Sequence, residues 1–146
     1  MAGKNLFVDS NVLVYANHTT SPFCVPARNK LVSFAPSFDA YWISRQVIRE
    51  YLVVMSNIML TAGKVDYKVL ETDVSNFLQS YTVADDTANV TKELLQLIEN
   101  TSTAGKTIHD ANIVATMISN GIDTLLTNNV ADFKRFSHLI KIEPLV

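Results

Sequence analysis

The chain has 146 residues, of which 48% are hydrophobic and 18% are charged, and its formal net charge at pH 7 is −2. This length and composition predict one globular domain with a substantial core, and they exclude an intrinsically disordered chain. The longest apolar stretches, such as residues 51–55, are much shorter than the roughly 20 residues that a membrane-spanning helix needs.

Short apolar runs alternate with helical patterns along the whole chain, in which apolar residues recur three or four positions apart. In chain order, the predicted elements are a strand at 5–8, helices at 11–16 and 25–34, a strand at 41–43, helices at 45–60 and 67–78, a strand at 81–84, helices at 86–98 and 108–118, and strands at 124–127 and 140–142. Asp9 or Ser10 can cap the first helix, and Ser44 can cap the helix that begins at residue 45.

This alternation predicts an α/β fold in which a parallel sheet is covered by helices on both faces. No repeat or change of composition divides the chain, so we expect a single domain over residues 1–146. Polar sites of such sheets lie at the carboxyl ends of the strands. Asp9 follows the first strand and residues 128–132 follow another, so acidic groups from distant parts of the chain should meet at one edge.

Two features indicate the compartment. Cys24 is the single cysteine, which excludes an internal disulfide and a thiolate zinc site and agrees with a reducing environment. The first residues lack the apolar stretch and the cleavage site of a secretory signal. We therefore expect the protein to be cytoplasmic.

Four acidic residues stand out by their context, and each also has an ordinary explanation. Asp9 could only cap a helix, Glu50 could border a solvated helix face, Asp110 could favour a first helical turn, and Asp132 could belong to a simple turn. Together they would repel one another, because two like charges about 4 Å apart cost roughly 4 kcal/mol at an effective dielectric constant near 20. Oxygen ligands suit Mg²⁺ or Mn²⁺, so the set favours metal-dependent cleavage of a nucleic-acid backbone.

Four motifs carry a resemblance to a known family. They are FVDSNVLVY at 7–15, QVIREY at 46–51, IHDA at 108–111 and LLTNNVADF at 125–133. In this order they resemble the PIN-domain family, and within it the VapC-like ribonuclease toxins of type II toxin–antitoxin systems. The resemblance implies a five-stranded parallel sheet between helices, RNA cleavage that depends on Mg²⁺ or Mn²⁺, a homodimer, and inhibition by a cognate antitoxin that occupies the active-site groove.

The resemblance also assigns roles to residues. Asp9 matches the first metal-ligating aspartate of the family, Glu50 the glutamate on a helix, and Asp110 the third acid. The fourth position is open between an asparagine at 128 or 129 and Asp132, and we expect Asp132 to bind the metal directly or through water.

Three further polar residues would support this site. Thr127 and Asn128 are expected to hold it together, and Asn11 is expected to orient the Asp9 carboxylate through a side-chain hydrogen bond.

The mildly acidic net charge gives no general sign of nucleic-acid binding, but this test is weak because carboxylates that hold metal ions do not repel phosphate. Positive charges close to the proposed ligands are candidates for RNA contact, although each alone is more typical of a solvated surface. They are Arg45, Arg49, Lys106, Lys134 and Arg135. His109 could protonate a leaving group, but a histidine beside a ligand is more often structural.

Other functions fit less well. A phosphatase of the haloacid dehalogenase type needs a second aspartate where Asn11 stands, and a receiver domain needs an aspartate where Ser44 follows the second strand. A PIN domain that only binds RNA or protein has no use for four repelling acids. A PIN nuclease of RNA processing, outside any toxin–antitoxin pair, stays open, and a neighbouring antitoxin gene would decide between the two.

Overall fold

The computed structural model describes residues 4–146, and within this range five strands form one parallel sheet in the order β3-β2-β1-β4-β5. The strands are β1 (Asn5–Val8), β2 (Ala40–Ser44), β3 (Thr82–Ala84), β4 (Thr124–Thr127) and β5 (Lys141–Pro144). The expectation that no leader is cleaved from the chain concerns residues 1–3, which lie outside the described residues.

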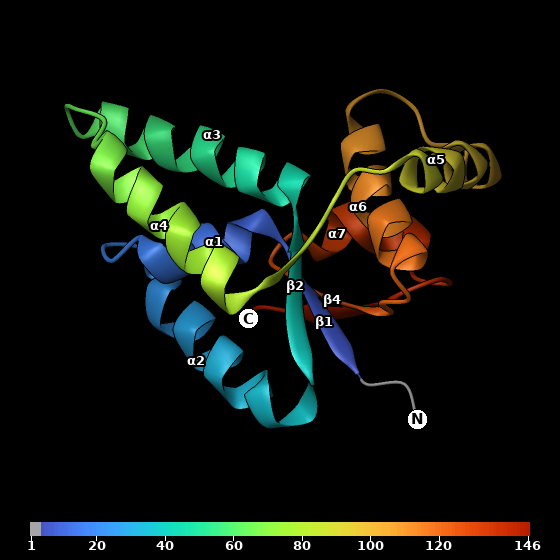
Figure 1. Ribbon diagram of the computed structural model, residues 1–146, viewed down its shortest axis with the longest axis horizontal. Coiled ribbons are helices and arrows are strands. Elements are labelled where there is room, and N and C mark those ends of the chain that lie inside the picture. The colour runs from blue at the N-terminus through green and yellow to red at the C-terminus, as the bar shows by residue number, and fades with distance from the viewer. Residues whose placement is uncertain (1–3) are drawn as a thin grey trace.

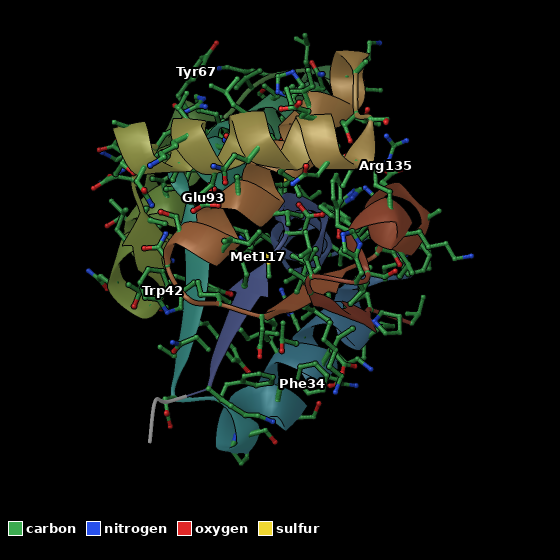
Figure 2. The ribbon with its side chains drawn as sticks, turned by 90° about the vertical axis from the view of Figure 1, so that its right-hand side faces the viewer. Phe34, Trp42, Tyr67, Glu93, Met117 and Arg135 are labelled. Carbon is green, nitrogen blue, oxygen red and sulfur yellow. The ribbon has the colours of Figure 1, made fainter. Side chains whose placement is uncertain are left out.

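Helices cover both faces of this sheet (Figure 1). In the described range they are α1 (Ser10–Asn17), α2 (Cys24–Phe34), α3 (Arg45–Thr61), α4 (Tyr67–Ser80), α5 (Ala88–Thr101), α6 (Ile108–Ser119) and α7 (Val130–Phe133). Helices α1 and α2 lie on one side, and α5 and α6 on the other. Figure 2 shows α5 lying across α6, which separates it from the strands.

The core forms where the central strands meet these helices. Leu6, Phe7 and Val8 of β1 are fully buried, as are Leu125 and Leu126 of β4. A strand of a parallel sheet has helices on both faces, so consecutive apolar residues are buried rather than alternate ones. This burial fixes the carboxyl ends of β1 and β4 side by side, with Val8 paired to Leu126.

The predicted α/β sandwich with a five-stranded parallel sheet is confirmed, most element boundaries lie within two residues of the predicted ones, and three differences are informative. The helix predicted at 86–98 is Ala88–Thr101, because the Thr87 hydroxyl accepts a hydrogen bond from the Val90 amide and caps the helix there. The last strand is Lys141–Pro144, where an edge position tolerates proline. The segment after β4, predicted as a turn, contains α7, whose Phe133 is buried.

Both predicted caps next to the site are present. The Asp9 carboxylate accepts from the Ser10 amide at the start of α1, and the Ser44 hydroxyl accepts from the Val47 amide at the start of α3. Each cap is the residue at which a strand gives way to a helix. Across residues 4–146, no helix combines the length and apolar character needed to cross a membrane.

Candidate active site

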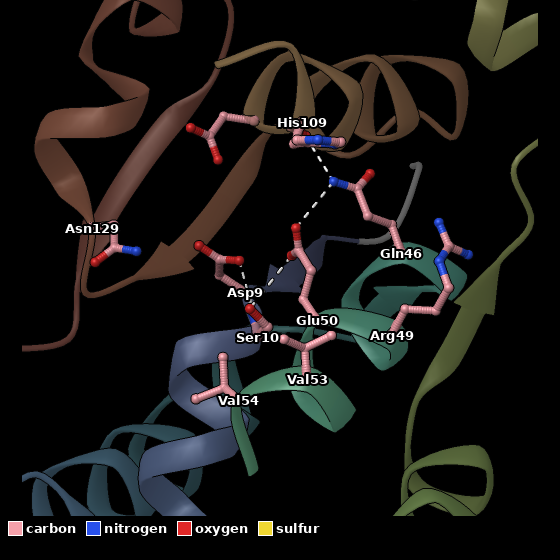
Figure 3. A pocket seen from close by; sticks show the side chains of 10 residues that line it. Asp9, Ser10, Gln46, Arg49, Glu50, Val53, Val54, His109 and Asn129 are labelled. Carbon is pink, nitrogen blue, oxygen red and sulfur yellow. Dashed lines mark hydrogen bonds between the residues drawn. The ribbon is translucent and has the colours of Figure 1, made fainter. Parts of the chain in front are cut away.

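A pocket of about 460 Å³ opens at the carboxyl ends of the central strands (Figure 3). Its walls come from the β1–α1 junction, from α3, from the start of α6 and from the segment after β4. The lining residues are Asp9, Ser10, Gln46, Arg49, Glu50, Val53, Val54, His109, Asp110 and Asn129. The pocket therefore joins segments that are widely separated in the sequence, as the strand-end argument predicts.

Asp9 is the most buried of the acidic groups in this pocket, with 4% of its surface exposed. Its Oδ1 accepts from the Ser10 amide at 2.8 Å, and its Oδ2 accepts from Asn11 Nδ2 at 2.9 Å and from Thr127 Oγ1 at 2.8 Å. Burial raises the pKa of Asp9, and the hydrogen bonds from Thr127, Ser10 and Asn11 oppose that rise. The carboxylate is thus held at both oxygens in a poorly solvated position.

Thr127 and Asn11 link the carboxyl ends of β1 and β4. Asn11 Nδ2 lies 3.3 Å from Thr127 Oγ1, and Asn11 Oδ1 accepts from the Asn128 backbone amide at 2.9 Å. The Asn129 amide donates to Thr127 Oγ1 at 3.0 Å. Asn128 therefore joins the site through its backbone, whereas the expected interaction between Asn11 and the Asp9 carboxylate runs through side chains.

Glu50 projects from α3 toward Asp9, and both of its carboxylate oxygens have a donor. Ser10 Oγ lies 3.5 Å from Oε1, a long hydrogen bond, and Gln46 Nε2 lies 3.3 Å from Oε2. Burial raises the pKa of Glu50, the Gln46 hydrogen bond lowers it, and the charge of Asp9 raises it further. The charge of Asp9 thus acts on the ionisation of Glu50, and both side chains line the same pocket.

Asp110 lies in the first turn of α6, on the wall opposite α3. Its pKa is raised to about 6, chiefly by burial and further by the charges of Asp132, Asp9 and Glu50. Asp132 lies in α7, is exposed, and does not line the pocket, but its charge acts on both Asp9 and Asp110. The structure thus brings Asp9, Glu50 and Asp110 together and places Asp132 at the margin.

Only one of the five proposed RNA-contacting cations, Arg49, lines the pocket. Arg45 forms an exposed ion pair with Asp85 at 3.1 Å, and Arg135 Nη1 lies 3.3 Å from Thr103 Oγ1. Lys106 and Lys134 are exposed outside the pocket lining. His109 of α6 is a lining residue as well.

Gln46 and the two valines of the lining were given no role from the sequence, and Ser10 was considered only as a helix cap. Gln46 precedes Glu50 by one helical turn, a spacing at which side chains meet on one helix face. Val53 and Val54 follow Arg49 and Glu50 at the same spacing and are 60% and 43% exposed. Helical periodicity counted forward and backward from Glu50 could have identified all three residues on α3.

The donor set of the pocket fits a hard divalent cation. The acidic groups provide only oxygen atoms, and burial in a like-charged cluster keeps the pKa values of Asp9, Glu50 and Asp110 above normal. Within residues 4–146, no three His, Cys, Asp or Glu side chains lie close enough to enclose an ion by themselves. An ion bound here would therefore keep water in part of its shell, which is the usual behaviour of Mg²⁺.

Comparison with known proteins gives one family and a set of similar folds. A model of the PIN domain matches residues 6–139. The chain is similar to DNA-bound VapBC from Salmonella typhimurium, at 18% identity and a TM-score of 0.71, over 98% of this chain and 99% of that chain. It is also similar to VapBC2 from Rickettsia felis bound to a promoter fragment, at 24% identity and a TM-score of 0.68, over 96% of this chain and 98% of that chain.

A third similar structure is VapC20 from Mycobacterium tuberculosis, a toxin that cleaves the sarcin-ricin loop. Its sequence identity is 15% and its TM-score 0.69, over 95% of this chain and 99% of that chain. No curated protein matches the sequence. At these identities, the structural likeness establishes a shared fold.

Proposed function

Because the chain belongs to the PIN-domain family, whose members are nucleases that generally use divalent metal ions, we propose that it is a metal-dependent endoribonuclease and the toxin of a type II toxin–antitoxin pair. The observation that carries this proposal is the meeting of Asp9, Glu50 and Asp110 in one pocket. These residues come from a strand end and two different helices, and burial raises the pKa of each. Such a costly cluster is typical of a functional site.

In this proposal, Asp9, Glu50, Asp110 and Asp132 hold Mg²⁺ or Mn²⁺, with Asp132 acting directly or through water from its place on α7. When bound, the ion would supply positive charge to the scissile phosphodiester and favour ionisation of the attacking water. Thr127 and Asn11 keep the Asp9 carboxylate in one orientation through hydrogen bonds of 2.8 and 2.9 Å to Oδ2.

Arg49 is the best placed residue to meet an RNA phosphate, because it is exposed and lines the pocket next to Glu50. Its planar guanidinium can donate two hydrogen bonds to one phosphate group. Lys106, Lys134, Arg135 and Arg45 lie outside the lining and would act only on RNA that extends beyond it.

The toxin role is supported by likeness to VapBC complexes and to a VapC toxin that cleaves the sarcin-ricin loop. By this likeness, we propose that a cognate antitoxin occupies the pocket, that the protein forms a homodimer, and that it acts in the cytoplasm. A small gene for a DNA-binding antitoxin directly beside this one would support the toxin role. Its absence would favour an RNA-processing nuclease with the same chemistry.

The function is tested by incubating purified protein with total cellular RNA and Mg²⁺ or Mn²⁺, with and without EDTA, and mapping the new RNA ends. We expect cuts that EDTA abolishes and that the Asp9→Asn protein does not make. Equal cleavage by Asp9→Asn and wild-type protein would refute the proposed site, and the absence of cleavage in every condition would refute the function.

A further inference from the structure

Gln46 is a buried side chain that uses its whole amide group inside the candidate site. It is 6% exposed, and its Oε1 accepts from Asn112 Nδ2 at 2.8 Å. Its Nε2 donates to the His109 carbonyl oxygen at 2.8 Å and to Glu50 Oε2 at 3.3 Å. A carbonyl oxygen can only accept, so the nitrogen of Gln46 must be the atom that faces His109.

This amide bridges the two helices that carry Glu50 and Asp110. Gln46 and Glu50 share one face of α3, whereas His109 and Asn112 belong to α6 and flank Asp110. Figure 3 shows Gln46 between the Glu50 carboxylate and His109. One nitrogen atom therefore connects a carboxylate oxygen on one wall of the pocket to the backbone next to the carboxylate on the opposite wall.

We propose that Gln46 is a positioning residue, which fixes the Glu50 carboxylate relative to Asp110 so that both can share one divalent ion. This inference rests on the proposed function. Without the Gln46 donor, Glu50 would keep only the long contact from Ser10 at 3.5 Å, and its carboxylate would be free to rotate. Residues that orient metal ligands typically change metal affinity or activity by about 10- to 100-fold when they are replaced.

The alternative is that Gln46 only stabilises the packing of α3 on α6. The Gln46 nitrogen serves both roles, because it donates to His109 on α6 and to Glu50, whereas the oxygen contacts only Asn112 on α6. Gln46→Met has a similar shape but removes all three hydrogen bonds, including the one to Glu50. Asn112→Leu removes only the bond to Gln46 Oε1 and leaves both Nε2 donors in place. A packing role predicts that both variants lose Mn²⁺ affinity to a similar extent, because each loses a hydrogen bond between α3 and α6. A positioning role predicts a loss of Mn²⁺ affinity in Gln46→Met alone.

The test measures Mn²⁺ binding by calorimetry on RNA-free protein, at a temperature where thermal unfolding shows every variant to be folded. We expect Gln46→Met to bind Mn²⁺ about 10- to 100-fold more weakly than wild type, and Asn112→Leu to bind within about 3-fold of it. Gln96→Met, an exposed glutamine on α5, is the matched control and should bind like wild type. If Gln46→Met does not fold, Gln46→Asn replaces it, because an amide one methylene shorter cannot reach both acceptors.

Two results would overturn the inference. One is wild-type Mn²⁺ affinity in the folded Gln46 variant, and the other is an equal loss in Asn112→Leu. RNA cleavage by the wild-type protein is measured alongside and separates this inference from the proposed function. A wild type that cleaves RNA, together with a Gln46 variant of unchanged Mn²⁺ affinity, rejects only the role of Gln46. A wild type that neither binds Mn²⁺ nor cleaves RNA rejects both.

Discussion

Thr127 donates its hydroxyl hydrogen to Asp9 Oδ2 over 2.8 Å, although 118 positions separate the two residues in the chain. The hydroxyl is fully buried at the end of β4, and Asp9 follows the neighbouring strand β1. The same oxygen of Thr127 accepts from the Asn129 amide, so its hydrogen is free to be directed at the carboxylate. This pair joins the two central strands at the point where the pocket opens.

We expect Thr127→Val to weaken both stability and the site. Valine has nearly the same shape but cannot donate, and a hydrogen bond to a charged group contributes about 1.5–3 kcal/mol. The free energy of unfolding should fall by this order, and the affinity for Mn²⁺ should fall about 10-fold or more. Chemical denaturation and calorimetry measure the two effects.

Thr124→Val is the matched control for this prediction, because Thr124 lies at the opposite end of β4 and donates only to Asp123. It should leave Mn²⁺ affinity unchanged. If Thr127→Val binds Mn²⁺ as tightly as this control does, Thr127 does not orient a metal ligand.

We expect Asp9→Asn and Asp110→Asn each to lower metal-dependent RNA cleavage by about two orders of magnitude or more, since each removes a proposed ligand. Metal-free stability should be unchanged or higher, because a neutral amide relieves repulsion among the acids. Gel-based cleavage rates and thermal unfolding test the two parts. Asp39→Asn, an exposed aspartate remote from the pocket lining, should behave like wild type.

Glu50→Gln should behave like these variants, while Asp132→Asn should lose less activity. Asp132 is exposed on α7 and reaches the other acids only through its charge, so its contact with an ion would be mediated by water. The measurement is the cleavage rate at several Mn²⁺ concentrations. If Asp132 contacts the ion through water, a higher Mn²⁺ concentration should restore the cleavage rate of Asp132→Asn. A loss in Asp132→Asn as large as in Asp9→Asn would make Asp132 a direct ligand.

Stability of the metal-free protein should decrease between pH 5 and pH 7. Asp110 has a pKa of about 6 in the folded chain against an ordinary value of 3.8, so its protonated form is favoured by folding. The stability contributed by such a group is complete below pH 3.8 and is lost as the pH rises through about 6. The pKa values of Asp9 and Glu50 are also raised and act in the same direction.

The measurement for this pH dependence is the Tm in EDTA across that range. Asp110→Asn should show a shallower decrease than wild type, because one of the three groups no longer titrates. A wild-type Tm that rises from pH 5 to pH 7 would contradict the assignment of raised pKa values to this cluster.

Arg49→Gln should weaken RNA binding more than it slows the chemical step. Arg49 is the single member of the five proposed RNA-contacting cations that lines the pocket, so KM should rise while kcat changes little. Loss of one phosphate contact should also reduce the slope of log affinity against log salt concentration by about 1. Arg45→Gln, whose arginine is paired with Asp85 on the surface, is the control. Equal effects of the two substitutions would show that Arg49 contributes to RNA binding only through its general positive charge.

Much of the fold follows from the sequence because its signals are local. The apolar runs of β1 and β4 and the helical spacing around Tyr51 each report burial directly. The strand-end rule then placed Asp9 near residues 128–132, whereas Glu50 and Asp110 were assigned to the site through the family resemblance. The short helix α7 was not predicted, because four residues carry too little periodicity to separate a helical turn from an irregular one.

The contacts of the site were harder to predict, since they depend on how helices rotate against one another. Gln46 is a polar residue in an amphipathic helix and therefore suggests a solvated position, but the approach of α6 buries it. In the same way, five cations were predicted to contact RNA because they are close in sequence to an acid. In the structure, Arg45 forms an ion pair with Asp85, and Arg135 donates a hydrogen bond to Thr103. Only the packed structure shows which of these side chains faces the pocket.

The topology of the sheet also determines when the pocket is formed during synthesis. Asp9 is synthesised early, but its neighbour β4 begins only at residue 124. A nascent chain that stops before β4 lacks the Thr127 hydroxyl and the strand that carries it. Whatever reaction this pocket performs, the producing cell is exposed to it only after the last of these segments, β4, has been synthesised.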